Sequence, residues 1–143
     1  MITETEVGHI IYDDLAFMGL ERRLKGHLKT GSLDGESPMV SEKVPDEGMI
    51  VIIPKSVSND KTYFNNCVVE VNILLPDVED ETNIKLNELF RKAYERLNDD
   101  MTGEYDGTWY RYSVRSHGIE DESRMKCHYV NISVNFEILN IRS

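Results

Sequence analysis

The last part of the chain carries the pattern that most constrains its fold. Over residues 130–138, apolar residues alternate strictly with polar ones. Side chains along a β-strand point alternately to opposite faces, so this segment predicts a strand with one apolar face and one face toward water. Strands of a parallel sheet that is covered on both faces carry nearly continuous apolar runs instead. The segment therefore excludes a parallel sheet buried on both faces.

An amphipathic helix is predicted near the start of the chain. Apolar residues from Val7 to Met18 recur at helical spacing and form one stripe. Gly19 and the arginine pair after it predict the end of this helix, although Leu20 and Leu24 would allow one further turn. Gly8 is expected to weaken the first turn, because glycine is a poor helix former.

A second and clearer helix is predicted over residues 83–97. Its apolar residues fall at i, i+3, i+4, i+7, i+8 and i+11, counted from Leu86. The segment before it is acidic, and Asp80 is its expected N-cap because a carboxylate accepts hydrogen bonds from unpaired backbone N–H groups. The helix is expected to end at residues 98–100.

The predicted strands are short segments rich in β-branched and aromatic residues. The last two are neighbours along the chain and most simply pair as an antiparallel hairpin, with the polar segment 117–125 as their connection. The expected strands cover residues 49–53, 63–75, 109–115 and 129–141, with a further short strand at 27–29.

These elements predict a single α+β domain over residues 1–143. We expect a mainly antiparallel sheet of four to five strands, with two helices packed on one face. An irregular loop over about residues 30–48 contains Met39 and Val40 in a polar setting. Long loops without secondary structure are uncommon in compact domains and often serve binding or assembly. Met39 and Val40 are therefore a candidate assembly contact; a loop that is merely mobile is the other interpretation.

The charge balance bears on the class of partner. The formal net charge is −10, from 26 acidic and 16 basic residues. Binding to nucleic acid without sequence preference depends on lysines and arginines that neutralise phosphates, so this charge opposes it, and it opposes binding to an anionic membrane as well. No apolar run approaches the length that spans a bilayer, and residues 1–6 do not resemble a signal peptide. We expect a cytosolic protein without a membrane partner.

The sequence indicates no catalytic, cofactor or metal site. The four histidines make no zinc-ligand spacing, and the acidic runs at 77–81 and 120–122 lack the spacing of a calcium loop. No Gly-x-Ser-x-Gly motif is present, and the glycines at 31 and 35 lack the lysine and the following helix of a phosphate-binding loop. Cys67 and Cys127 are expected to be buried and reduced. We therefore expect no enzyme.

One group of aromatic residues is the best argument for nucleic-acid binding. Trp109, Tyr110 and Tyr112 lie next to Arg111 and Arg115 and could form a platform on which bases stack. Aromatic residues are also ordinary strand formers, and the net charge opposes the contact. The simpler interpretation is a strand.

The order of the elements resembles a known group of proteins. A helix, an irregular loop and the strand GMIVIIP at 48–54 are followed by the strand and turn VVEVNILLPD at 68–77. A helix over 83–97 comes next, and a hairpin ends in NISVNFEI at 131–138. The chain resembles the tail-terminator, or tail-completion, proteins of tailed bacteriophages and prophages in the order of its elements, in its length and in the segment VVEVNILLPD at 68–77. The resemblance covers nearly the whole chain and contains no catalytic motif.

The resemblance implies a structural protein of virion assembly. Such proteins form homo-oligomeric rings, commonly hexamers, that cap a finished tail tube and join it to the head connector. The implied partners are further copies of the chain, the tail-tube protein and the head-connector protein. The implied location is the cytoplasm of the bacterial host and then the tail or neck of the virion. DNA passes through such a ring without sequence-specific binding, which suits an acidic protein.

Two other hypotheses come from different classes. The chain could be a small acidic binding or regulatory module that docks on a basic protein, since opposite charges speed docking. It could also be an enzyme whose site combines distant residues, such as His117 or His128 with a carboxylate. A deep pocket that holds a histidine against a carboxylate would support the enzyme.

The loop generates one prediction. If Met39 lies at a contact between copies, Met39→Glu should weaken self-assembly without unfolding the domain, because it would bury an unpaired charge in the contact. Light scattering would measure assembly, and circular dichroism would check the fold. Unchanged assembly would place the contact elsewhere.

Overall fold

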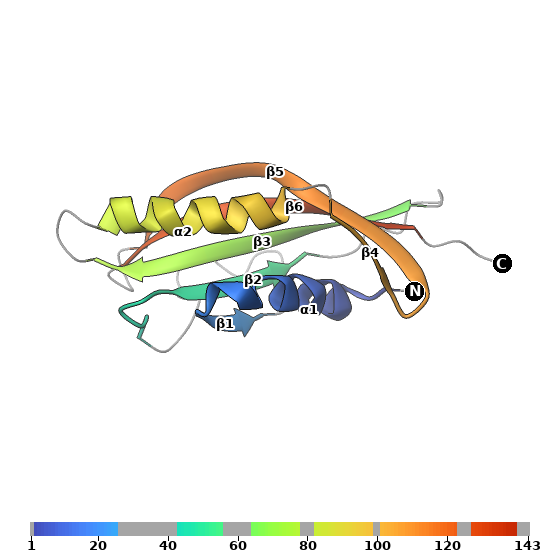
Figure 1. The fold of residues 1–143 in the computed structure, drawn as a ribbon, viewed down its shortest axis with the longest axis horizontal. Coiled ribbons are helices and arrows are strands. Elements are labelled where there is room, and N and C mark those ends of the chain that lie inside the picture. Colours follow the sequence, from blue (N-terminus) through green and yellow to red (C-terminus); the bar gives the residue numbers. More distant parts are fainter. Residues whose placement is uncertain are drawn as a thin grey trace, which may run out of the picture.

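Two α-helices and six strands make up the described part of the chain, which covers residues 2–25, 43–55, 64–77, 82–98, 101–122 and 127–139 in a computed structural model (Figure 1). The N-terminal elements are α1 (Glu4–Asp14), the short 3₁₀ helix η1 (Ala16–Met18), β1 (Glu21–Leu24) and β2 (Met49–Pro54). The others are β3 (Phe64–Pro76), α2 (Thr82–Leu97), β4 (Met101–Tyr105), β5 (Thr108–Glu122) and β6 (Cys127–Leu139).

The strands form one mixed sheet in the order β1-β2-β3-β6-β5-β4. β1 pairs with β2 in parallel, and the other four pairs are antiparallel. The sheet is curled, and β5 arches along α2 before it descends to the hairpin with β4 (Figure 1). The predicted α+β class with two helices and a mainly antiparallel sheet is therefore confirmed. The predicted count of four to five strands is too low, and the parallel pair was not expected.

Both helices pack on the same face of the sheet, as predicted. The main core contains Val7 and Ile11 of α1 and Leu86 and Ala93 of α2. On the sheet side it includes every second residue of the central strands, among them Val69, Val71, Ile73, Ile132, Val134 and Phe136. The opposite face carries a smaller apolar cluster of Val44, Met49, Val51, Ile53, Leu74 and Cys127. The apolar residues of the alternating segment 130–138 therefore face the helices.

The first helix ends earlier than its apolar pattern allowed. Its start is a capping box, in which the Thr3 side chain accepts from the Glu6 N–H and the Glu6 carboxylate accepts from the Thr3 N–H. Its last part becomes the 3₁₀ turn η1, which stops at Gly19 in the left-handed conformation (φ 69°). The possible extension to Leu24 is therefore wrong, because Leu24 lies in β1.

β1 lies at a charged segment that the sequence pattern assigned to the end of a helix. Arg22 in this strand turns back onto α1, where its guanidinium donates to the Tyr12 carbonyl and lies 4.0 Å from the centre of the Tyr12 ring. This contact anchors a polar strand to the helix, so the strand needs no apolar alternation of its own. The short strand predicted at 27–29 lies outside the described residues, as do Met39, Val40 and most of the predicted loop.

The second half of the sheet is larger than predicted. The strand β4 follows α2 almost directly, and β5 continues to Glu122 through the segment that was expected to be a polar connection. A register shift between Val114 and Ser116 interrupts the pairing of β5 with β6. Residues 115–120 are all exposed, so no buried face imposes an apolar pattern on this part of the strand. This is why the alternation did not reveal it.

Gly8 has a packing role that the sequence pattern did not show. The residue is buried in α1 at the point where the helix crosses β1 and β2. A Cβ atom at this position would lie 2.4 Å from Leu24 Cδ1 and 3.3 Å from Pro54 Cγ. The absence of a side chain lets the helix approach the sheet closely, which offsets the poor helix propensity of glycine.

Replacement of Gly8 by valine tests this contact. We expect Gly8→Val to lower the free energy of unfolding by about 1–3 kcal/mol, because the added atoms overpack the space against Leu24. The matched control is Gly118→Val in β5, where a Cβ would meet no described atom within 4 Å. Urea unfolding at neutral pH would measure both variants. Equal stability of the two would contradict a tight contact at Gly8.

Candidate functional site

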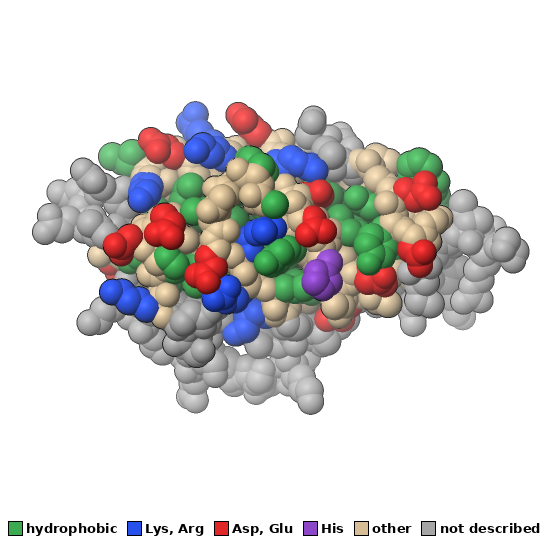
Figure 2. Space-filling view, turned by 60° about the horizontal axis from the view of Figure 1, so that its bottom comes forward, with side chains coloured by type: hydrophobic (Ala, Val, Ile, Leu, Met, Phe, Trp, Pro, Cys, Tyr) green, Lys and Arg blue, Asp and Glu red, His purple; other side chains and the backbone are tan. Residues whose placement is uncertain are grey.

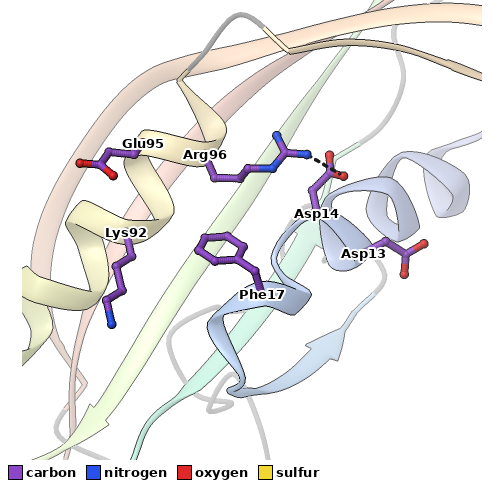
Figure 3. A pocket seen from close by; sticks show the side chains of 6 residues that line it. All are labelled: Asp13, Asp14, Phe17, Lys92, Glu95 and Arg96. Carbon is purple, nitrogen blue, oxygen red and sulfur yellow. Dashed lines mark ion pairs between the residues drawn. The ribbon is translucent and has the colours of Figure 1, made fainter.

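A hollow of about 520 Å³ lies between the end of α1 and the second half of α2 (Figure 3). It lies on the helix side of the molecule, where two elements from distant parts of the sequence meet. Its lining mixes acidic, basic and aromatic side chains: Asp13, Asp14, Phe17, Lys92, Glu95 and Arg96.

Two of the lining side chains, Asp14 and Arg96, form a hydrogen-bonded group with Tyr112 of β5. Arg96 Nη2 lies 3.0 Å from Asp14 Oδ1, and Arg96 Nη1 donates to the Tyr112 hydroxyl oxygen at 3.1 Å. The Tyr112 hydroxyl in turn donates to Asp14 Oδ2 at 2.5 Å. These contacts join α1, α2 and β5. We refer to Asp14, Arg96 and Tyr112 as the polar clip.

The electrostatics of the polar clip favour a structural role for Tyr112. Its side chain is 2% exposed. Burial is the largest cause that raises its pKa far above the usual 10.0, and the hydrogen bond to Asp14 adds to it. The hydroxyl therefore stays protonated at neutral pH and donates to Asp14. The clip holds α1, α2 and β5 together. Both terminal nitrogens of Arg96 are used in it, one on Asp14 and one on Tyr112.

The outer part of the hollow is different, because it offers an exposed aromatic ring next to a cation. Phe17 is 57% exposed, and its ring points from η1 toward α2 (Figure 3). Lys92 makes no ion pair with another described residue. The carboxylates of Asp13 and Glu95 turn away from the Phe17 ring (Figure 3). This part of the hollow can accept an aromatic group that carries an acidic neighbour.

A second hollow, of about 410 Å³, lies over β4, β5 and β6. Arg111 and Glu137 line it, and Arg111 Nε lies 2.6 Å from Glu137 Oε2. Further along the same face, Asn131 Nδ2 donates to Glu70 Oε2 at 2.9 Å and to Asn72 Oδ1 at 2.8 Å. These side chains hydrogen-bond one another, so the polar face predicted at 130–138 forms a network across neighbouring strands.

The hairpin of β4 and β5 forms an arm, which we define as residues 101–112. Its turn is Asp106–Gly107, with φ values of 50° and 81°, the combination of a tight two-residue hairpin turn. Gly103 lies opposite Tyr110, and a Cβ at Gly103 would lie 2.4 Å from the Tyr110 hydroxyl oxygen. The Tyr110 ring thus covers the glycine and stiffens the arm. Trp109 near the tip is 52% exposed.

The aromatic residues considered for base stacking do not form one platform. Tyr110 and Tyr112 stack on Phe136 at ring-centre distances of 5.1 and 5.6 Å and so face the helix side. Trp109 and Arg111 alternate with them and belong to the other face of β5. The strand interpretation therefore holds, and the arrangement contradicts a shared stacking surface.

The histidines considered for catalysis are separated. His128 Nδ1 contacts Asp77 Oδ1 at the end of the β3–β6 pair, and neither residue lines either hollow described above. His117 packs against Phe90 and Tyr94 of α2, at ring-centre distances of 4.7 and 5.7 Å. A histidine is thus placed against a carboxylate, away from both hollows described above.

Cys67 and Cys127 are buried, as predicted, and form no disulfide with each other. Cys67 Sγ lies 3.0 Å from the Lys55 carbonyl oxygen, and burial raises the pKa of its thiol to about 11. At neutral pH the thiol is therefore protonated and a poor nucleophile. Within the described ranges, no three histidine, cysteine, aspartate or glutamate side chains come together as metal ligands would.

Comparisons with known proteins add no family to these observations. The chain matches no family model, and no curated protein matches it at a significant level. None of the described helices combines the length and apolar character that a membrane span needs. The arm tip and the outer hollow were not predicted as sites, because the sequence pattern does not tell an exposed aromatic residue from one in the core.

The polar clip generates a stability prediction. Tyr112→Phe removes a buried hydroxyl that bonds both Asp14 and Arg96, so we expect the free energy of unfolding to fall by about 1–2 kcal/mol at pH 7. The matched control is Tyr94→Phe, whose hydroxyl accepts from Asn98 at the surface. Urea unfolding would compare them, and equal losses would contradict a structural role for the clip.

The same variant has a predicted pH dependence. Folding raises the pKa of Tyr112, so its contribution to stability is complete below the unfolded value of 10.0 and is lost as the pH rises above it. Wild type should therefore lose stability above about pH 10 more steeply than Tyr112→Phe. Some decline should remain in the variant, because the pKa values of Tyr105 and Tyr110 are raised as well. Parallel curves for both proteins would contradict the prediction.

Proposed function

We propose that the protein is a tail terminator of a tailed bacteriophage or prophage. It assembles into a closed, hexameric ring that caps the tail tube and joins it to the head connector. Its copies gather in the cytoplasm of the bacterial host and end in the tail or neck of the virion. The order of helices and strands and the phrase VVEVNILLPD at 68–77 support this proposal through their resemblance to such proteins.

The observation that carries the proposal is that the two ends of the sheet differ. β1 and β4 are the outermost of the described strands. Strand edges offer unpaired backbone groups to a neighbour. β1 is short and anchored to α1 by Arg22, whereas β4 belongs to the arm with the exposed Trp109. Two different surfaces on one chain favour head-to-tail contacts, which close into a ring when the rotation between copies allows it.

The charge of the chain agrees with passage of DNA through such a ring. The formal net charge is −10, so phosphates are repelled by the protein as a whole. On the face in view, acidic, basic and apolar side chains are interspersed, with acidic and hydrophobic ones adjacent at the end that carries the arm (Figure 2). The network of Glu70, Asn72, Asn131 and Ser133 on β3 and β6 is hydrogen-bonded within itself and contains no cation to hold phosphates. A lining of this kind would let DNA slide.

The small acidic binding module is the second candidate, and the same net charge favours it. In that case the carboxylates would be the recognition surface for a basic protein, and binding would weaken as salt rises. The two candidates differ in their oligomeric state. The ring forms from further copies of the same chain, alone or on a tail tube, whereas the binding module needs a partner of opposite charge.

The mass of the assembled protein tests the proposal. Light scattering over a wide concentration range should give a closed species of about six copies of the 16.5 kDa chain, and electron microscopy should show rings. Rings should also appear at the ends of tubes formed by the tail-tube protein of the same phage, which the proposal expects to be encoded near this chain.

One result would contradict the proposal, and a second measurement on it would select the alternative. A monomer at every concentration that also ignores the tube would exclude a terminator. If that monomer bound immobilised polylysine at low salt and was released at high salt, the acidic binding module would be favoured instead. Polylysine is a suitable probe because it carries the opposite charge without any fold of its own.

A further inference from the structure

We propose that the arm of one copy docks in the hollow between α1 and α2 of the next copy, with Trp109 on Phe17 and Glu104 beside Lys92. This inference rests on the proposed ring and names the contact that would build it. The arm and the hollow both belong to the described part of the chain. Within one copy, Lys92 and Glu104 form no ion pair with a described residue, and neither Trp109 nor Phe17 contacts another described aromatic ring.

The arm presents an aromatic anchor with an acidic neighbour. Glu104 and Trp109 are directly opposite in the β4–β5 register, so their side chains share one face of the arm. Trp109 is 52% exposed. Asp106 at the turn adds a second carboxylate. An exposed tryptophan on a stiff hairpin is the kind of residue that dominates binding energy at protein interfaces.

The other face of the arm is turned toward the body of the molecule. The Glu6 carboxylate at the start of α1 is the main reason that the pKa of Tyr105 is raised, so this face of the arm lies near α1. The Tyr110 ring over Gly103 stiffens the arm before any contact forms. Prior ordering lowers the entropic cost of docking.

The hollow offers an exposed aromatic ring and one cation outside the polar clip, and the carboxylates of Asp13 and Glu95 line it as well. Its outer part offers the Phe17 ring, 57% exposed, and the Lys92 ammonium. Trp109 stacked on Phe17 would bury two rings that are exposed in the single copy, and Lys92 would meet the Glu104 carboxylate. The hollow has a volume of about 520 Å³ and is shallow and open to solvent, so it would support one face of a ring without enclosing it.

The arm cannot reach the hollow of its own copy. Tyr105 lies near Glu6 in the first turn of α1, whereas Phe17 lies beyond the end of this helix. From Glu6 to the last residue of α1 the helix rises by about 12 Å. Trp109 also belongs to the sheet face away from the helices. The contact is therefore between copies, and because arm and hollow are different surfaces it is head-to-tail.

A mixing experiment tests the contact directly. Trp109→Ala removes the anchor of the arm, and Lys92→Glu reverses the cation of the hollow. Each variant alone should lose at least about tenfold in association and remain mainly monomeric. A mixture of the two should give dimers and no rings, because only one intact arm and one intact hollow remain in each pair. Light scattering would distinguish these masses.

Two matched controls distinguish loss of the contact from two other effects, the loss of an exposed apolar side chain and the reversal of a charge. Ile119→Ala removes an apolar side chain of β5 that is also 52% exposed and lies outside the arm. Arg91→Glu makes the same charge change on α2 outside the hollow. Both should form rings like wild type. Circular dichroism and urea unfolding should show all four variants folded, since the replaced side chains are exposed.

Charge reversal provides an independent test. Glu104→Lys should weaken association to a similar extent as Lys92→Glu, and the double variant should recover most of it, because the ion pair is rebuilt with opposite polarity. Rings that form equally well with Trp109→Ala and Lys92→Glu would overturn this contact and leave the proposed function standing. A wild-type chain that never assembles, alone or on tubes, would overturn both.

Discussion

The structure depends on the antiparallel pairing of β3 with β6. The two strands run side by side over 13 residue pairs, from Phe64 with Leu139 to Pro76 with Cys127. This register places most apolar residues of both strands on the face where α1 and α2 pack, and the polar residues with Leu74 and Cys127 on the other. A slip by one residue would exchange the two faces, so the buried helix side holds the register in place.

The outer parts of the sheet follow from this centre. The parallel strand β1 is held to α1 through Arg22, and Gly8 lets that helix lie close to the sheet. On the other side, the polar clip of Asp14, Arg96 and Tyr112 ties both helices to β5. The tip of the arm lies beyond Tyr112 of the clip, so the strand that carries the exposed Trp109 is held to both helices at Tyr112. Rigid support of this kind suits a protein that acts through its contacts.

Much of the fold was predictable because it rests on local periodicity. The alternation at 130–138 and the stripe of α2 each bury one face, and burial imposes a pattern that the sequence displays. β1, β4 and the second half of β5 escaped prediction for the opposite reason. Residues 115–120 are exposed throughout, and β1 is stabilised by an arginine that reaches back to α1. Where solvent covers both faces, or a single side chain supplies the support, no period appears.

The sequence by itself determined the α+β class, the faces of the central strands and helices, and the absence of recognisable catalytic and metal-ligand motifs. The tertiary structure alone decided which distant residues meet. Asp14 and Tyr112 are 98 positions apart and share a hydrogen bond, and Phe17 lies with Lys92 in one hollow. The physical reason is that periodicity records burial, which acts on each residue separately. The partners of a side chain depend on how the chain folds back on itself, and a local pattern contains no such information.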